Sequence, residues 1–250
     1  MSEIEGLYAI WLREFKVFQR ERSRVISAIA QPIIWLFLLG GGIGASVDPD
    51  KITGSYQAFL FPGIVAMSTM FGTVFYGLYI VWDRKIDVLK EILVAPISRI
   101  TVFFGKVLGG ATDAMITAAI ILVLGVALVG ISPVGVLTGL GIALMLAVGM
   151  VSIGLTLGAF FESMEGFQVI VTFMIFPLFF LSAALYPLAG LDPAMAAAVR
   201  ANPVTYAVDA MRGALIGQSY FPIALDLLVV GLFDVVMVLV GTWAFRRMKL

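Results

Sequence analysis

Residues 107–129 read VLGGATDAMITAAIILVLGVALV, and this stretch contains a single charged residue, Asp113. A helix needs about 20 apolar residues to cross the roughly 30 Å hydrocarbon core of a bilayer, so this stretch is long enough to span one. Comparable apolar stretches occupy 25–45, 59–81, 134–161, 167–188 and 223–245. The sequence therefore predicts an all-α integral membrane protein with six transmembrane helices, forming a single transmembrane domain over residues 1–250.

The composition excludes several classes of function. Hydrophobic residues make up 61% of the chain and charged residues 13%, which is far from the balance of a soluble domain. Sixteen basic and sixteen acidic residues cancel, so nothing points to a nucleic-acid partner. Cysteine and histidine are absent, which excludes disulfides, thiolate and histidine catalysis and most zinc sites. We expect no catalytic residue, no metal site and no cofactor bound by this chain.

Lysine and arginine are distributed unevenly among the predicted loops. Thirteen lie before the first span, between the second and third, or after the sixth, whereas the alternate loops hold only Lys51, Arg200 and Arg212. Basic loops face the cytoplasm. We therefore expect a multi-pass membrane protein with both termini in the cytoplasm.

The N-terminal segment 1–24 has the pattern of an amphipathic helix. Six apolar residues share one face, namely Ile4, Leu7, Tyr8, Trp11, Phe15 and Phe18, and basic residues gather opposite them. A helix of this kind lies in the membrane interface and contacts lipid headgroups. The pattern fits both a simple membrane anchor and a contact surface for a cytosolic subunit.

The cytoplasmic loop 82–106 contains a short amphipathic stretch, Val88–Val94, which we expect to be a helix ending near Pro96. Ser98 is placed to cap the next helix. The external segment 189–221 contains two helical stretches: one begins at Asp192-Pro193, and the other covers 205–216 and stops at Gly217. Two short helices that return to the same side indicate a re-entrant hairpin packed on protein.

Three further features concern packing and buried charge. Gly105 with Gly109, and Gly154 with Gly158, have the spacing that lets helices approach closely. Asp209 and Arg212 lie three residues apart on one helix, and we expect them to pair. Asp234 lies near the middle of the last span, where an acid is costly. It either lines a transport path or makes a structural hydrogen bond.

Three segments carry a family resemblance: 91–99 (EILVAPISR) followed by Gly105-Lys106, 179–187 (FFLSAALYP) and 202–213 (NPVTYAVDAMRG). Together they resemble ABC-2 type permeases, the membrane subunits of ABC exporters of the daunorubicin-resistance kind, and the similarity extends over essentially the whole chain. One departure is Ala183 or Ala184, where that family often has glycine.

The resemblance implies three groups of functional residues. A coupling helix would dock into an ATPase through Glu91, Ile92, Leu93, Ala95, Pro96 and Arg99. An interface helix beside it would use Trp11, Arg13, Phe15, Lys16 and Arg20. The external gate or re-entrant segment would contain Tyr186, Pro187, Asn202, Pro203, Tyr206, Asp209 and Arg212.

The sequence contains no G-x-x-x-x-G-K-[ST] loop to hold phosphates, so ATP hydrolysis must come from a separate ABC ATPase subunit, which would bind ATP and Mg²⁺. The resemblance implies a homodimer of permeases with two ATPase copies, located in the inner membrane of a prokaryotic cell. We expect a multidrug-type exporter that moves an amphipathic, drug-like or lipid-linked substrate by alternating access. Aromatic residues near the outer mouth suit such a substrate: Phe173, Phe176, Phe179, Phe180, Tyr186 and Tyr206.

Two other functions remain open from the sequence. One is a secondary transporter in which Asp234 couples movement to a proton gradient, although the chain halves show no inverted repeat and no second buried charge. The other is a membrane scaffold that transports nothing.

Overall fold

The computed structural model describes residues 2–42 and 55–248, and every regular element within these residues is an α-helix. Residues 43–45 of the first predicted span, together with Lys51, lie outside the described residues. In chain order the helices are α1 (Glu3–Arg20), α2 (Arg22–Gly42), α3 (Tyr56–Phe75), α4 (Leu78–Lys85), α5 (Val88–Val94), α6 (Arg99–Val129), α7 (Pro133–Phe160), α8 (Met164–Phe180), α9 (Pro193–Ala201), α10 (Pro203–Ile216) and α11 (Ile223–Arg247).

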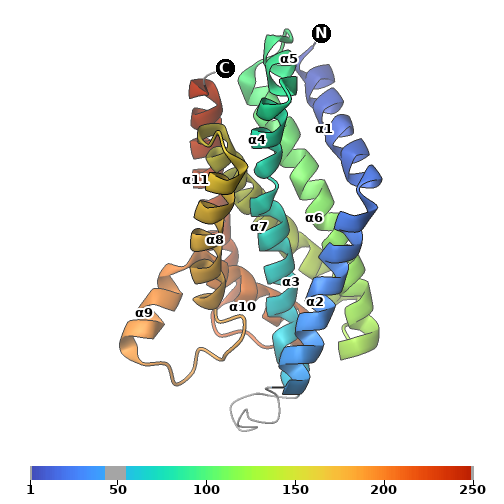
Figure 1. Ribbon diagram of the computed structural model, residues 1–250. Helices are drawn as coiled ribbons and strands as arrows, with labels where there is room; N and C mark the ends of the chain where they lie inside the picture. The colour runs from blue at the N-terminus through green and yellow to red at the C-terminus, as the bar shows by residue number, and fades with distance from the viewer. Residues whose placement is uncertain (1, 43–54, 249–250) are drawn as a thin grey trace.

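The helices form an elongated bundle (Figure 1). Helices α2, α3 with α4, α6, α7, α8 and α11 run back and forth between its two ends. The two chain termini and α5 lie together at one end, which we call the α5 end, and α9 and α10 lie at the other, the α9 end. The predicted coupling helix and both termini therefore share one end of the bundle, and their orientation in a membrane stays a prediction.

Four helical segments are long and apolar enough to cross a membrane: Tyr56–Lys85, Arg99–Val129, Pro133–Phe160 and Ile223–Arg247. The apolar parts of α2 and α8 are shorter, Ile26–Gly42 and Met164–Phe180. The predicted span 167–188 is too long, because α8 ends at Phe180 and the chain then turns, with Ala183 in the left-handed region at a φ of 56°. The described residues thus contain four spans of full length, and the six-span arrangement is not fixed by helix length.

Several helix ends follow from capping residues. The Ser98 hydroxyl accepts a hydrogen bond from the Thr101 N–H at 3.1 Å, so the predicted cap of α6 is confirmed. Asp192 caps α9 in the same way, and Gly217, with a φ of 69°, ends α10. Helix α10 begins at Pro203, slightly earlier than predicted. Helix α5 ends at Val94, just before Pro96 as expected.

Helix α7 lies at the centre of the bundle and packs against α3, α6, α10 and α11. A methyl group on Gly154 would overlap the Val74 carbonyl, and one on Gly158 would overlap the Gly77 carbonyl. These two glycines therefore let α7 touch the backbone of the α3–α4 junction. On α6, Gly105 and Gly109 make room in the same way for Ile10 and Glu14 of α1. Both predicted glycine pairs are packing sites.

Candidate functional site

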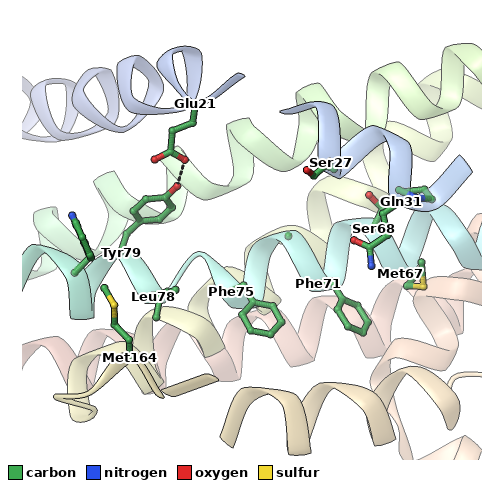
Figure 2. A pocket seen from close by; sticks show the side chains of 14 residues that line it. Glu21, Ser27, Gln31, Met67, Ser68, Phe71, Phe75, Leu78, Tyr79 and Met164 are labelled. Carbon is green, nitrogen blue, oxygen red and sulfur yellow. Dashed lines mark hydrogen bonds between the residues drawn. The ribbon is translucent and has the colours of Figure 1, made fainter. Parts of the chain in front are cut away.

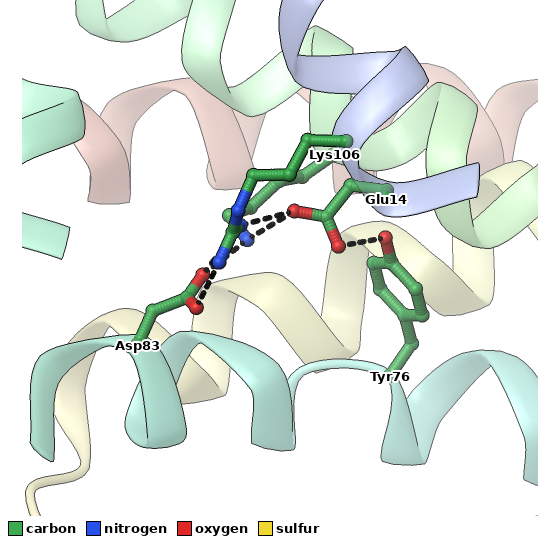
Figure 3. A network of polar contacts seen from close by, with 5 residues as sticks. Glu14, Tyr76, Asp83 and Lys106 are labelled. Atoms are coloured by element: carbon green, nitrogen blue, oxygen red, sulfur yellow. Dashed lines mark hydrogen bonds and ion pairs between the residues drawn. The ribbon is translucent and has the colours of Figure 1, made fainter. Parts of the chain in front are cut away.

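Four charged side chains and one tyrosine form a buried network between α1, the α3–α4 segment and α6 (Figure 3). The exposed fraction of Lys106 is 0%, and those of Glu14 and Asp83 are 3% each. Sequence reasoning placed Lys106 in a cytoplasmic loop, whereas it is a fully buried residue of α6. Its ammonium group lies 2.9 Å from Glu14 Oε1 and 2.7 Å from Asp83 Oδ2.

Arg13 and Tyr76 complete this charge network. Arg13 Nη2 lies 2.6 Å from Asp83 Oδ1, and its Nη1 lies 2.8 Å from Glu14 Oε1. The Tyr76 hydroxyl donates to Glu14 Oε2 at 2.8 Å. Two acids face two bases, so the formal charges balance. The network thus joins three helical segments that are far apart in the sequence.

Electrostatics keep the network ionised. Burial by itself raises the pKa of Glu14, but the positive charge of Lys106 and its hydrogen bond, together with Arg13 and Tyr76, outweigh that effect and hold the pKa below its ordinary value. Removing one partner from such a cluster leaves a buried charge uncompensated, which is strongly destabilising. The network is therefore a point at which α1 is firmly attached to α4 and α6.

A signal for this network exists in the sequence. At 100° per residue, Glu14 falls at the edge of the apolar face of α1, between Ile10 and Leu7. An acid on an apolar helix face requires a basic partner. Lys106, one residue after the small Gly105, is a candidate for that partner. We did not predict the network from this signal.

A cavity of about 740 Å³ lies between α2, α3, α4 and the start of α8 (Figure 2). One group of lining side chains is apolar, with Phe71 and Phe75 of α3 and Met164 of α8. A second group is polar, with Ser27 and Gln31 of α2 and Ser68 of α3. At one end the Tyr79 hydroxyl donates to Glu21 Oε2 at 2.6 Å. The cavity is therefore amphipathic and large enough for a drug-sized ligand.

The aromatic residues of this cavity differ from those expected at the outer mouth. Its described lining contains Phe71, Phe75, Tyr79 and Trp82, and none of the six aromatic residues named from the sequence. Instead, Phe176 and Phe179 pack edge-on against Phe71, with ring centroids 5.4 and 6.1 Å apart. These two α8 rings therefore contact Phe71, a lining residue, without lining the cavity themselves.

Comparison with known proteins now identifies the family. A family model described as ABC-2 type transporter matches residues 5–216, which is most of the chain. The chain belongs to the ABC-2 type transporter family. As a member of this family it is a transport permease, and the predicted resemblance is confirmed.

Curated relatives of this ABC-2 permease include a nodulation protein and two transport permeases. Nodulation protein J of Rhizobium leguminosarum bv. viciae is 28% identical, covering 96% of this chain and 93% of its own. The putative transport permease ycf38 of Porphyra purpurea is 28% identical over 84% of this chain and 73% of its own. The inner membrane transport permease YadH of Escherichia coli is 25% identical, covering 87% of this chain and 86% of its own.

The six residues predicted to couple this ABC-2 permease to an ATPase have different environments. Glu91 is exposed at the surface of α5, as is Pro96 beyond its end, whereas Ile92 and Leu93 pack against the apolar core at the α5 end. Ala95 is the residue that ends α5. Arg99 donates hydrogen bonds to the carbonyls of Arg246 and Met248, at 3.2 and 2.6 Å. Arg99 is thus held at the C-terminus of α11, where a positive charge is favourable.

The five residues predicted for the interface helix also divide into two groups. Lys16 and Arg20 are exposed, whereas Arg13 belongs to the charge network. The Trp11 indole donates to Thr112 of α6 at 3.0 Å, and its ring stacks on Phe15. Helix α1 therefore packs on α6 through part of the face that was expected to lie in the lipid boundary.

The predicted gate residues fix the turns at the α9 end through backbone groups. Tyr186 donates to the Phe180 carbonyl at 2.7 Å, Tyr206 donates to the Arg200 carbonyl at 2.9 Å, and Asn202 donates to the Leu178 carbonyl at 2.6 Å. Pro203 is the first residue of α10, and Pro187 lies in the turn after α8. The structure brings these residues together as local supports of one end of the bundle.

Asp209 and Arg212 bind other groups in preference to each other. The Asp209 carboxylate accepts hydrogen bonds from the backbone N–H groups of Tyr220 and Phe221, each at 2.8 Å. Arg212 donates to the Ala183 carbonyl at 3.0 Å and lies over the Phe59 ring at 4.1 Å. The expected ion pair is replaced by these contacts because both side chains are buried beside carbonyl and N–H groups that need partners.

Asp234 lies where α11 meets α7. A methyl group on Gly149 of α7 would overlap the Asp234 carboxylate, so this glycine provides the space that the acid occupies. Asp234 is not among the described residues that line the cavity between α2 and α3. The Oδ1 atom of Asp234 is buried and has no hydrogen-bond partner among the described residues, so the structural hydrogen bond expected from the sequence is not seen at that atom.

Proposed function

We propose that this chain is the permease subunit of an ATP-driven exporter that moves an amphipathic, drug-like or lipid-linked substrate out of the cytoplasm. A separate ABC ATPase subunit would bind ATP and Mg²⁺ and dock on α5 and α1. Two permease copies would assemble with two ATPase copies in the inner membrane, with both chain termini on the ATPase side. ATP binding would shift the permease between two existing conformations by favouring one of them.

The observation that carries this proposal is the buried charge network. Helix α5 connects α4 to α6, and the network ties both of them to α1. A displacement of α5 by the ATPase would therefore move α1, α4 and α6 together. Arg84 extends this attachment, because it donates to the Ala159 and Phe161 carbonyls at the end of α7.

The cavity supports the transport part of the proposal. Its walls come from α2, α3 and α4, and α4 is itself one of the helices held by the network. A movement of α4 relative to α2 would change the shape of the cavity. If an ATPase docks at the α5 end, α4 would connect its docking site to this ligand-sized space.

The proton-coupled alternative is not favoured. It requires Asp234 to exchange protons along a pathway, yet this side chain lies in the α7–α11 contact beside Gly149. We therefore propose no function for Asp234 in coupling.

The test is reconstitution with a partner ATPase. The chain alone in nanodiscs should hydrolyse no ATP, and co-expression with its ATPase should give a complex whose hydrolysis is stimulated by substrate. Glu91→Lys, an exposed change on α5, should abolish co-purification of the ATPase while expression and insertion stay normal. Glu162→Lys, exposed between α7 and α8, is the matched control. Wild-type ATPase binding by Glu91→Lys would argue against docking at α5.

A further inference from the structure

We propose that Asp209 of α10 and Asp226 of α11 bind a single monovalent cation, sodium, where these two helices pack together at the α9 end. The proposal goes beyond the transport function and does not depend on it. It assigns a ligand to a buried acid, Asp226, that belongs neither to the charge network nor to the described lining of the cavity.

Asp226 is a buried acid without a partner. It lies in the first turn of α11 with an exposed fraction of 0%, although its neighbours Leu225 and Leu227 are 39% and 38% exposed. Both of its carboxylate oxygens are buried and have no hydrogen-bond partner among the described residues. Because bulk water does not reach these oxygens, the negative charge needs a compensating positive charge inside the protein.

The buried base at this end of the bundle does not supply that charge. Arg212 donates to the Ala183 carbonyl at 3.0 Å, and its guanidinium lies over the Phe59 ring at 4.1 Å. None of the ion pairs among the described residues contains Asp226. The compensating charge is therefore a bound proton or a bound cation.

Asp209 lies beside Asp226, across one short stretch of backbone. Its carboxylate accepts a hydrogen bond from the Phe221 N–H at 2.8 Å, and the carbonyl of the next residue, Pro222, accepts one from the Asp226 N–H at 3.2 Å. Asp209 also acts electrostatically on both Asp226 and Arg212. Two carboxylates and one guanidinium carry a formal net charge of −1, which a single monovalent cation balances.

A sodium ion satisfies this cluster better than a proton or a divalent ion does. A proton would neutralise Asp226 but leave the new O–H group and the other oxygen without partners, whereas a cation can contact both oxygens at once. Carboxylate oxygens are ligands for hard cations. A divalent ion would leave an excess positive charge, and the described residues contain no group of three or more acids that could hold one. The enclosed position of Asp226 favours a small ion over potassium.

The bound ion would attach the start of α11 to α10. Asp209 by itself holds only the turn before α11, through the N–H groups of Tyr220 and Phe221. A cation shared with Asp226 would fix the first turn of the helix as well. The expectation of no metal site rested on the absence of histidine and cysteine, which hard cations do not need as ligands.

The test uses the full-length permease in phosphatidylcholine nanodiscs without ATPase. Thermal unfolding and the binding of radioactive sodium are measured in sodium, potassium or choline chloride at one pH and one ionic strength. We expect saturable sodium binding, and a melting temperature about 3 °C higher when sodium is tenfold above its Kd, because a ligand that binds only the folded state stabilises it. Potassium should have a smaller effect, and choline none.

Variants of the acids locate the ion. Asp226→Asn keeps the side-chain size and should abolish sodium binding, and Asp209→Asn should weaken it about tenfold. The wild type should be more stable than Asp226→Asn in sodium chloride but no more stable in choline chloride, where its buried carboxylate has no cation. Asp234→Asn is the matched control, since Asp234 is the other acid of α11 and lies against Gly149 of α7. This control should keep the full sodium response.

Three results would overturn the inference: equal stability in sodium and choline, an unchanged sodium response in Asp226→Asn, or stronger stabilisation by magnesium or calcium than by sodium. The first of these would assign the compensating charge to a proton. If Asp226→Asn does not fold, competition for radioactive sodium on the wild type still decides between sodium and the other ions. Neither ATP hydrolysis nor transport enters the assay, so its failure would leave the exporter proposal standing.

Discussion

The two ends of the bundle use buried charge in opposite ways. At the α5 end, Glu14, Asp83 and Lys106 bind one another across three helical segments. At the α9 end, Asp209 and Arg212 bind backbone groups of nearby turns. The first cluster joins helices that could otherwise move separately, whereas the second fixes the path of the chain where it reverses.

This difference indicates where movement can be transmitted. Side chains that pair with one another need all of their partners in place, so we expect the helices joined at the α5 end to move together. A carboxylate bound to the N–H groups of Tyr220 and Phe221 holds one turn and depends on little else. The comparison can be tested by removing one member from each cluster.

Lys106→Ala should have the largest effect. It leaves Glu14 and Asp83 buried with only Arg13 to balance them, and we expect a loss of about 3–5 kcal/mol in the free energy of unfolding. Thermal unfolding in nanodiscs measures this loss. Lys90→Ala, at an exposed lysine paired with Asp87, is the matched control and should have little effect.

A compensating change sharpens this prediction. Lys106→Met combined with Glu14→Gln restores the charge balance, since Arg13 and Asp83 remain paired. The double variant should recover part of the stability lost by Lys106→Met alone. If the effects of the two changes on the free energy of unfolding simply add, the stability of the network does not depend on its charge balance.

Asp209→Asn should have a smaller and local effect. The amide accepts fewer hydrogen bonds from the Tyr220 and Phe221 N–H groups, and we expect a loss of about 1–3 kcal/mol. Amide hydrogen exchange should accelerate at those two residues and stay unchanged at the α5 end. Asp192→Asn is the control, because asparagine caps a helix as well as aspartate does. Unchanged exchange at Tyr220 and Phe221 would contradict the assigned role.

Ala183→Gly should have the smallest effect, and in the opposite direction. Ala183 adopts a φ of 56°, which costs a residue with a Cβ more than it costs glycine. The gain, after the entropy lost by glycine on folding, is roughly 0.5 kcal/mol. Ala184→Gly, at a neighbour without positive φ, should destabilise the protein instead. Thermal unfolding of both variants decides whether the backbone at Ala183 is strained.

Much of this architecture could be predicted because it depends on local signals. Apolar length, the caps at Ser98 and Asp192, and the stop at Gly217 are each encoded within a few residues. The position of Glu14 indicates that it needs a basic partner, but the sequence does not show that Asp83, Lys106 and Tyr76 meet there, because they lie dozens of residues away. Arg99 shows the same limit, since its partners at the end of α11 are found only when the helices are packed. Pairings between distant segments are set by tertiary contacts that a single sequence does not display.

The glycines of α7 restrict where insertions and deletions can occur in the sequence of this helix. Gly149 faces α11, whereas Gly154 and Gly158 face the α3–α4 junction, so the two contacts lie on different sides of one helix. Inserting a single residue between them would rotate one contact by about 100° relative to the other. Apolar substitutions elsewhere along α7 leave that angular relation intact, but insertions and deletions do not. Length differences between distant relatives should therefore fall outside this segment, which makes it a natural anchor for aligning them.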